Sequence, residues 1–310
     1  MRIAVLGGGG AMGGLFGAYL ADAGHEVILV DVCKEAVEAI RANGLIIEEK
    51  DGSIRQIKVE ATSEPASVGT VDLVISFVKC YHTEAAITLA LPMIGPRTQV
   101  LSLQNGWGNA DRIAQVIGPE KVLVGVTYHS ATLLAPGRVK HPGTGQTSIG
   151  KIDPADATRL DAISEAFTTS GLDCLLPPRI ETDIWKKLAL NACVLPLSAC
   201  LGWLTHELAE CESTREEMMA ILREVIAVTE ARGHPLDFDE RWQAILGLLT
   251  RARGAKPSML QDVDSRRQTE IDVINGAVVK AGKAAGVPTP HNAAMYALIR
   301  AIETKFQPLT

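Results

Sequence analysis

The sequence lacks the features that mark metal-binding, secreted or nucleic-acid-binding proteins. Its six cysteines are scattered without a CxxC pair, and no histidine stands near them at the spacing of zinc ligands. A formal net charge of -6 gives no reason to expect nucleic acid as a partner. We therefore expect a reduced, cytoplasmic protein without a structural metal.

Signals for secretion or membrane insertion are also missing. The first residues, MRIAVLGGGG, enter an apolar run without the basic and small-residue regions of a signal peptide. No apolar stretch reaches the length that we expect of a membrane span, so we expect no membrane contact. The 310 residues, 47% of them hydrophobic, are enough for a stable core and suggest two domains.

The first half of the chain alternates between strand and helix patterns. Strands are predicted at residues 2–7, 25–31, 71–79, 98–106 and 122–133, and a β-hairpin at 45–62. Stretches of helical spacing separate most of these strands. Such alternation is typical of a mostly parallel sheet with helices on both faces. We therefore predict an α/β fold that begins with a Rossmann-type, doubly wound sheet.

From about residue 182 the pattern is helical only. Helices are predicted at 183–201, 207–232, 238–252, 258–285 and 290–305. The pair Pro177-Pro178 precedes this change and is the natural boundary. We therefore predict a dinucleotide-binding Rossmann domain at 1–177 and an all-helical substrate domain at 178–310.

A glycine-rich turn follows the first strand and opens the first helix. Gly8, Gly10 and Gly13 match the pattern G-x-G-x-x-G, with Ala11 and Met12 between them. The glycines make a tight turn and let the backbone approach a pyrophosphate, which the helix N-terminus favours. A glycine-rich turn can also be only a turn, but its place directly after the strand favours a dinucleotide site at these five residues.

Asp31 closes the second strand, 23 positions after Gly8. A carboxylate at this place accepts hydrogen bonds from the ribose hydroxyls of NAD and repels the 2′-phosphate of NADP. Of the next three residues, Lys34 is the one that could offset this repulsion. The alternative interpretation is that Asp31 merely caps the following helix. The residue predicts NAD as the cofactor, with NADP as the alternative.

Lys79 and Asn105 stand at the carboxyl ends of two further strands. Ligands of doubly wound sheets bind beyond these ends, so both side chains should face the nicotinamide half of the dinucleotide. Each could instead be ordinary loop chemistry, because Asn105-Gly106 is a standard turn pair. Two polar residues at equivalent strand ends favour a functional role for both.

The apolar helix at 183–201 carries polar residues along one stripe. Lys187, Asn191 and Ser198 fall at steps of four and seven. Burial statistics alone favour a solvated lysine and a buried amide paired with backbone. Glu270 lies near the buried side of the helix predicted at 258–285, where it could pair with Lys187. That stretch could equally be a charged surface helix, and composition does not choose between these alternatives.

Several motifs together resemble the ketopantoate reductase (2-dehydropantoate 2-reductase) family over essentially the whole chain. They are RIAVLGGGGAMGG, SFVK, SLQNG, HPGTGQTSIG, WKKLALNACVLPLSA and PSMLQDVDSRRQTEIDVINGAVVKAGKAAGVPTPHN. The last two are specific to the family in a way that the glycine turn is not. In this family a Rossmann domain and a helical domain close over a 2-keto acid, and NADPH reduces its ketone to a D-2-hydroxy acid.

The resemblance implies a role for each matching residue. Lys187 would be the general acid at the substrate oxygen, and Glu270 would hold that lysine and bind the hydroxyl side of the substrate. A charged donor suits this position because hydride attack builds negative charge on the ketone oxygen. The other matching residues would bind substrate, namely Asn191 and Ser258, or line the crevice near the nicotinamide, namely Asn105 and Lys79.

Two positions depart from the family pattern. Leu195 stands where the family commonly has a second asparagine that contacts the substrate's hydroxyls, which predicts a more apolar substrate. Relatives with this architecture act as D-2-hydroxyacid dehydrogenases on branched or aromatic substrates such as the mandelate pair. Asp31 stands where NADPH-using members tend to carry a basic residue.

Three functions follow from these residues and this resemblance. The first is NAD(P)H-dependent reduction of a 2-keto acid, with ketopantoate and pantothenate biosynthesis as the family default. The second is an NAD-dependent D-2-hydroxyacid dehydrogenase with mandelate-like substrates. The third is a non-catalytic dinucleotide sensor, although a sensor has no need of a proton donor. The expected partner is a small 2-keto or 2-hydroxy acid, and the long C-terminal helices could support a homodimer.

Overall fold

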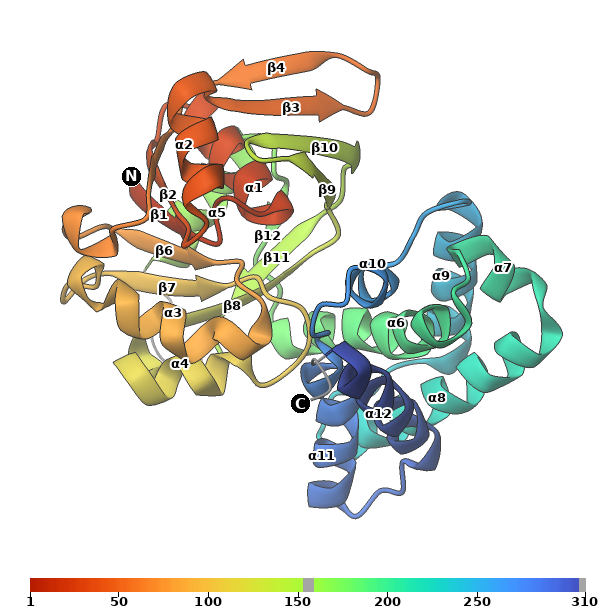
Figure 1. The fold of residues 1–310 in the computed structure, drawn as a ribbon. Helices are drawn as coiled ribbons and strands as arrows, with labels where there is room; N and C mark the ends of the chain where they lie inside the picture. Colours follow the sequence, from red (N-terminus) through yellow and green to blue (C-terminus); the bar gives the residue numbers. More distant parts are fainter. Residues whose placement is uncertain (153–158, 307–310) are drawn as a thin grey trace. The chain divides into compact units, whose positions relative to one another are not determined.

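The computed structural model describes residues 1–152 and 159–306, which divide into two compact units (Figure 1). The first unit holds residues 1–104 and 109–180. The second holds the chain from residue 181 onward together with the short segment 105–108. The strand pattern gave no sign that this segment joins the helical unit.

The first unit is built on an eight-stranded sheet with the order β12-β11-β8-β7-β6-β1-β2-β5. The strands are β1 (Arg2–Leu6), β2 (Glu26–Val30), β5 (Glu60–Thr62), β6 (Leu73–Ser76), β7 (Gln99–Ser102), β8 (Val122–Thr127), β11 (Thr147–Gly150) and β12 (Cys174–Leu175). All neighbours pair in parallel except β11 and β8. The inner strands are mostly apolar and almost entirely buried, as expected of a parallel sheet covered on both faces. The predicted α/β class is confirmed.

Helices of the first unit follow the strands. They are α1 (Ala11–Asp22), α2 (Lys34–Asn43), α3 (Thr83–Ala90), α4 (Asn109–Ile117) and α5 (Leu160–Thr169). Short 3-10 helices are η1 (Pro65–Ser67), η2 (Cys80–His82), η3 (Leu91–Met93) and η4 (Pro119–Lys121). Leu15, Phe16 and Leu20 of α1 are fully buried in the core against β1 and β2.

A second sheet has the order β4-β3-β10-β9. Its strands are β3 (Leu45–Glu49), β4 (Ile54–Ile57), β9 (Ser130–Ala135) and β10 (Arg138–Gly143). The predicted hairpin is present as β3 and β4, but β5 leaves it to join the main sheet beside β2. The single strand predicted at 122–133 is wrong, because the chain leaves the main sheet after β8 and enters the second sheet at β9.

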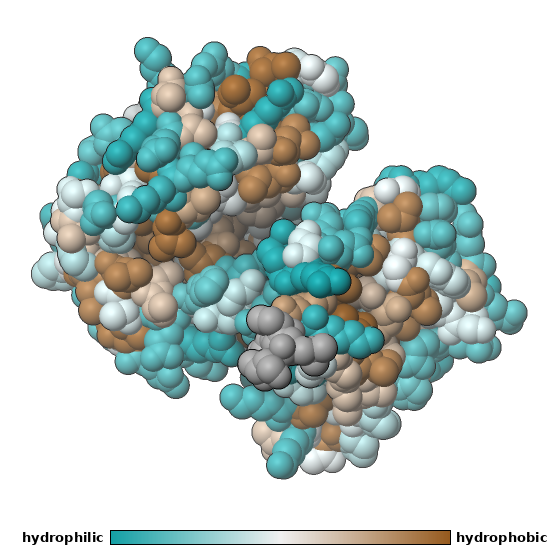
Figure 2. Space-filling model, in the orientation of Figure 1, coloured by the Kyte–Doolittle hydropathy of each residue, from teal (hydrophilic) through white to brown (hydrophobic). Residues whose placement is uncertain are grey.

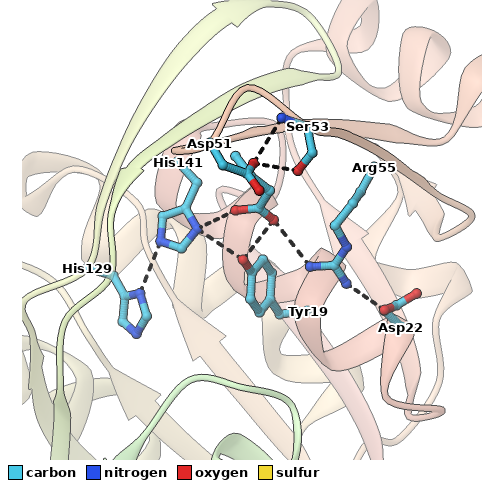
Figure 3. Close-up of polar contacts among 8 residues, drawn as sticks. Tyr19, Asp22, Asp51, Ser53, Arg55, His129 and His141 are labelled. Atoms are coloured by element: carbon cyan, nitrogen blue, oxygen red, sulfur yellow. Dashed lines mark hydrogen bonds and ion pairs between the residues drawn. The ribbon is translucent and has the colours of Figure 1, made fainter.

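A buried polar network ties this second sheet to α1 (Figure 3). The Tyr19 hydroxyl donates to Glu49 Oε1 at 2.8 Å, and Glu49 Oε2 lies 3.0 Å from His141 Nδ1. His141 Nε2 lies 3.2 Å from Nδ1 of His129. Arg55 forms an ion pair with Glu49 at 3.2 Å. Because these residues come from α1, β3, β4, β10 and the turn before β9, the network connects the helix to the whole sheet.

The buried end of this network should make the stability of the first unit depend on pH. Burial lowers the pKa of His129 from its ordinary value of 6.5, the neighbouring His141 lowers it further, and the backbone of Leu172 and the charge of Asp173 oppose the shift. The unfolded chain therefore binds this proton at a higher pH than the folded chain. We expect the free energy of unfolding to fall as the pH decreases below about 6.5, and His129→Phe to weaken that dependence.

Calorimetric unfolding between about pH 7.5 and pH 5.5 measures this effect. His82 is exposed, so His82→Gln is the matched control and should keep the dependence of the unmodified protein. An equal pH dependence in the His129→Phe variant would remove His129 as its source.

The second unit is helical. Its helices are α6 (Ile180–Leu201), α7 (Thr205–Glu210), α8 (Glu212–Ala231), α9 (Phe238–Arg251), α10 (Ser258–Asp264), α11 (Asn275–Ala285) and α12 (Pro290–Glu303), with 3-10 helices η5 (Ile271–Val273) and η6 (Thr304–Phe306). The single helix predicted at 207–232 is wrong. Two helices, α7 and α8, take its place, because the backbone of Cys211 between them is extended and forms the N-cap of α8.

The helix predicted at 258–285 is also wrong. The α10 helix ends at Asp264, and Arg266 has a φ of 51°, in the left-handed region that ends helices. Glu303 of α12 then holds the following segment, since its Oε1 accepts from the N–H and the hydroxyl of Thr269 at 2.8 and 2.7 Å. This break places Glu270 on a loop that leads into η5 rather than on a continuous helix.

The long helix α6 is long and apolar enough to cross a membrane by length and composition, contrary to the expectation from the sequence. However, 72% of its apolar window is buried inside the structure, as in the core helix of a folded unit. The face in Figure 2 mixes hydrophilic and hydrophobic residues on each unit.

A proline inside α6 is supported by another helix. Pro196 has no N–H to donate to the carbonyl of Ala192 one turn earlier. Asn275 Nδ2 donates to that carbonyl instead at 3.2 Å, and it also donates to Asn292 Oδ1 at 3.1 Å. The first residue of α11 therefore supplies the donor that lets α6 continue past the proline.

Candidate active site

The glycine-rich turn has the geometry that a dinucleotide site requires. The N–H groups of Gly7 and Gly8 donate to the carbonyl of Val30 at 3.0 and 3.2 Å, so the turn is fixed to the end of β2. A Cβ on Gly13 would lie 2.3 Å from the carbonyl oxygen of Gly7, and therefore only glycine lets α1 start so close to β1. Ala11 and Met12 form the first turn of α1, where unpaired N–H groups favour an anion.

The carboxylate of Asp31 lies against this turn. Its Oδ2 accepts the N–H of Gly9 at 2.9 Å, and its Oδ1 accepts the N–H of Cys33 at 2.9 Å. Asp31 is not the N-cap residue of α2, which is Cys33, although its side chain accepts the N–H of that residue. Each carboxylate oxygen has a second lone pair, so the residue can still accept hydrogen bonds from a ribose. This arrangement fits a dinucleotide.

The two residues predicted at strand ends belong to different units. Lys79 is a half-buried residue after β6 and is the N-cap of η2 in the first unit. Asn105 follows β7 in sequence but belongs to the second unit with the rest of segment 105–108.

Asn105 connects the two ionisable residues that the sequence singled out. Lys187 Nζ donates to Asn105 Oδ1 at 3.0 Å, and Asn105 Nδ2 donates to Glu270 Oε2 at 3.3 Å. Glu270 is only 6% exposed. A chain of hydrogen bonds therefore runs from the ammonium of Lys187 through the amide of Asn105 to the carboxylate of Glu270. The sequence had suggested a direct Lys187–Glu270 pair, and the structure places Asn105 between the two.

Burial decides the acidity of the lysine. Burial lowers the pKa of Lys187 to about 8, while the negative charge of Glu270 opposes this shift. The two effects were foreseeable from sequence, but their balance was not. A lysine with a pKa of about 8 gives up a proton far more readily than one with the ordinary value of 10.5.

The other predicted site residues lie on α6 and α10 and differ in how far they are exposed. Asn191 and Leu195 follow Lys187 at intervals of one turn on α6, and each is 8% exposed. Ser258 is exposed at the start of α10. Ser198 does not extend the polar stripe, because its hydroxyl donates to the carbonyl of Trp203 at 2.5 Å and fastens the end of α6. Within residues 1–152 and 159–306, no three potential ligand side chains gather to hold a metal.

A glycine turn that fits a dinucleotide and a lysine with a lowered pKa are features of enzymes that transfer hydride to a carbonyl. Together with its relatives, they define this protein as an NAD(P)-dependent oxidoreductase that acts on a CH–OH group. The chain belongs to the ketopantoate reductase family. The family profile described as Ketopantoate reductase PanE/ApbA matches residues 3–154, and that of its C-terminal domain matches residues 179–303.

Curated relatives and solved structures agree over nearly the full length. The 2-dehydropantoate 2-reductase of Streptococcus pyogenes serotype M3 is 30% identical over 298 residues, which cover 96% of each chain. That of Vibrio cholerae serotype O1 is 32% identical and covers 98% of each chain. A ternary structure of D-mandelate dehydrogenase with NADH and anilino(oxo)acetate has a TM-score of 0.93 at 30% identity and covers 99% of each chain. These relatives favour an enzyme over a non-catalytic sensor.

Proposed function

We propose that this protein reduces the ketone of a 2-keto acid to a hydroxyl group, with Lys187 as the general acid. The observation that carries the proposal is the position of Lys187, which donates to Asn105 and whose pKa is lowered to about 8 by burial. A dinucleotide bound at the glycine turn would supply the hydride. The first unit, with its expected extent of 1–177, would hold the dinucleotide, and the second, expected at 178–310, would supply the acid.

The chain's own residues would handle the charge and the proton. When hydride reaches the carbonyl carbon, the π electrons move to the oxygen, which becomes negatively charged. The ammonium of Lys187 stabilises this charge and then gives its proton to that oxygen, so the product is a neutral hydroxyl. Lys187 is left as an amine and takes its next proton from water.

Asn105 and Glu270 would keep Lys187 oriented and protonated for this step. The amide of Asn105 fixes the direction of Nζ, and the charge of Glu270 favours the protonated lysine. Glu270 would also accept a hydrogen bond from the substrate's hydroxyl side. We assign Asn191 and Ser258 to the substrate, and Lys79 together with Asn105 to the vicinity of the nicotinamide.

A panel of 2-keto acids with both reduced cofactors tests this function. Oxidation of the dinucleotide at 340 nm should depend on the 2-keto acid and should yield the D-2-hydroxy acid. The panel should include ketopantoate, a branched 2-keto acid and benzoylformate, with the corresponding 2-hydroxy acids as controls for the reverse reaction. No turnover with any member would overturn the proposed function.

A second candidate is a D-2-hydroxyacid dehydrogenase for branched or aromatic substrates. Leu195 favours it, because a buried apolar side chain on the stripe of Lys187 and Asn191 suits an apolar substrate. The similarity to D-mandelate dehydrogenase also supports it. Ketopantoate carries a hydroxyl group that needs a polar partner, so the two candidates differ in what this position must provide.

Exchanging Leu195 separates these candidates. Leu195→Asn should shift the ratio of kcat/KM values toward ketopantoate by about tenfold, since one buried polar contact is worth about 1–3 kcal/mol. Leu195→Met keeps the apolar character and about the same volume, so it should leave the ratio nearly unchanged. An unaltered ratio in the asparagine variant would show that Leu195 does not line the substrate site.

A further inference from the structure

The segment that carries Asn105 is anchored by the residue two positions later. The N–H of Trp107 donates to the carbonyl of Val273 at 2.8 Å. The ring centroid of Trp107 lies 5.6 Å from that of Trp185, with the planes tilted by 34°. Val273 follows Glu270 by three residues in η5, and Trp185 precedes Lys187 by two in α6. Trp107 therefore contacts both segments that carry the partners of Asn105.

A cation completes the contact. The guanidinium of Arg232 lies 5.4 Å from the ring of Trp107 and 5.7 Å from the ring of Trp185, within the range of cation–π attraction. Arg232 is the C-cap of α8. The segment that follows Arg232 is tied to the start of α6, because Nε2 of His234 lies 2.8 Å from a carboxylate oxygen of Glu181.

Backbone packing leaves segment 105–108 little freedom. Gly106 has a φ of 86°, and a Cβ on it would lie 2.2 Å from the carbonyl oxygen of Val273. The residue can therefore only be glycine at this close approach to η5. The turn pair Asn105-Gly106 presents the amide, and Trp107 fastens the far end of the turn.

We propose that Trp107, stacked with Trp185 and Arg232, is a positioning residue that holds Asn105 between Lys187 and Glu270. This inference rests on the proposed function, in which Lys187 protonates the substrate. Removal of the indole ring keeps the backbone contact with Val273 but removes the contact with Trp185 of α6, so the turn shifts relative to α6 and Asn105 no longer fixes Nζ. Water then reaches Lys187, and its pKa moves back toward the ordinary value.

The effect is expected in the chemical step more than in binding. Trp107→Ala should lower kcat by about ten- to a hundredfold, the scale of a small misplacement of catalytic groups. KM for the 2-keto acid should change far less, and the Kd of the dinucleotide should not change. The alkaline limb of the kcat–pH profile should move to higher pH. Trp107→Phe keeps an aromatic ring and should restore most of kcat, and Arg232→Met should give an intermediate loss.

Trp242 on α9 supplies the matched control. Trp242→Ala removes the same side chain from a helix that carries none of the proposed site residues, and it should leave the pH profile unchanged. Thermal unfolding of each variant shows whether it is folded. A Trp107→Ala variant that is folded and keeps its kcat and pH profile, or that changes KM alone, would overturn the inference.

A second measurement needs no substrate. The rate at which Lys187 reacts with acetic anhydride as a function of pH, followed by mass spectrometry of its peptide, reports the pKa of this amine. We expect a higher pKa in the folded Trp107→Ala variant than in the unmodified protein and in Trp242→Ala. An unchanged pKa would overturn the positioning role. If the unmodified enzyme reduces no 2-keto acid, the proposed function fails, and this measurement still decides the role of Trp107.

Discussion

Replacing Lys187 with methionine is expected to lower kcat by at least about a hundredfold, the usual cost of losing a general acid. Methionine keeps an unbranched chain of similar size but cannot donate a proton. The ammonium of Lys187 donates to Asn105, and the substitution removes both the charge and the proton that it would supply to the ketone oxygen. Binding of the dinucleotide should survive, because the glycine turn and Asp31 belong to the first unit.

The adjacent Lys186 offers a control of the same chemistry. Nζ of Lys186 lies 3.5 Å from Oδ1 of Asp183 on the same helix, and Lys186→Met removes an equal charge. This control should retain most of its activity. Near-normal turnover of the Lys187→Met variant in steady-state kinetics would exclude Lys187 as the acid.

The same kinetic series should show the pKa of this lysine. Its pKa of about 8 means that the acid form is present below that pH and is lost above it. Reduction of the 2-keto acid should therefore slow as the pH rises through about 8. Oxidation of the 2-hydroxy acid needs the amine form as a base and should accelerate over the same range. The residual activity of the Lys187→Met variant should show neither the slowing of reduction nor the acceleration of oxidation as the pH rises through about 8.

The second large effect is expected at Asp31, which should make NADH the better cofactor. A 2′-phosphate at this place would lie beside a carboxylate. At an effective dielectric constant of about 20, like charges about 4 Å apart repel by about 4 kcal/mol. Solvent and the exposed Lys34 reduce this repulsion, but a remainder of about 1.4 kcal/mol gives about a tenfold preference. Asp31→Arg should reverse it in favour of NADPH.

The hydrogen bonds of Asp31 suggest a cleaner variant. Asp31→Asn keeps an oxygen that can accept the N–H of Gly9 but removes the charge, so it should narrow the preference while preserving the turn. The ratio of kcat/KM values for the two cofactors at equal substrate measures both variants. A clear preference of the unmodified protein for NADPH would mean that the carboxylate does not face the phosphate.

Local patterns predicted the first unit well for a physical reason. The alternation of buried strands and helices, the glycine turn and the β3–β4 hairpin depend on residues close together in sequence. The break between α10 and α11 does not. It depends on Glu303, 34 positions away, which holds the backbone of Thr269. Helical spacing therefore predicted one helix where the tertiary contact imposes two.

The candidate site shows the same limit. The stripe of polar residues on the helix at 183–201 pointed to Lys187, and a pairing with Glu270 was one of two open alternatives until the resemblance to a family favoured it. The bridging hydrogen bonds of Asn105 join segments that lie 82 and 165 positions apart. Pro196 is a sequence signal for such a distant contact, because a proline within a helix leaves a carbonyl that another residue must satisfy, here Asn275.

Segment 105–108 belongs to the helical unit although it lies within the sequence of the first unit, and this affects where chimeras of related chains can be joined. A chimera that joins residues 1–180 of one relative to the remainder of another takes Asn105 and Trp107 from the first parent, but Lys187 and Glu270 from the second. Such a gene fusion would therefore draw the amide and the indole from one parent and the residues that they contact from the other. If Asn105 positions Lys187 as proposed, a crossover meant to exchange substrate preference must carry this tetrapeptide along with the helices.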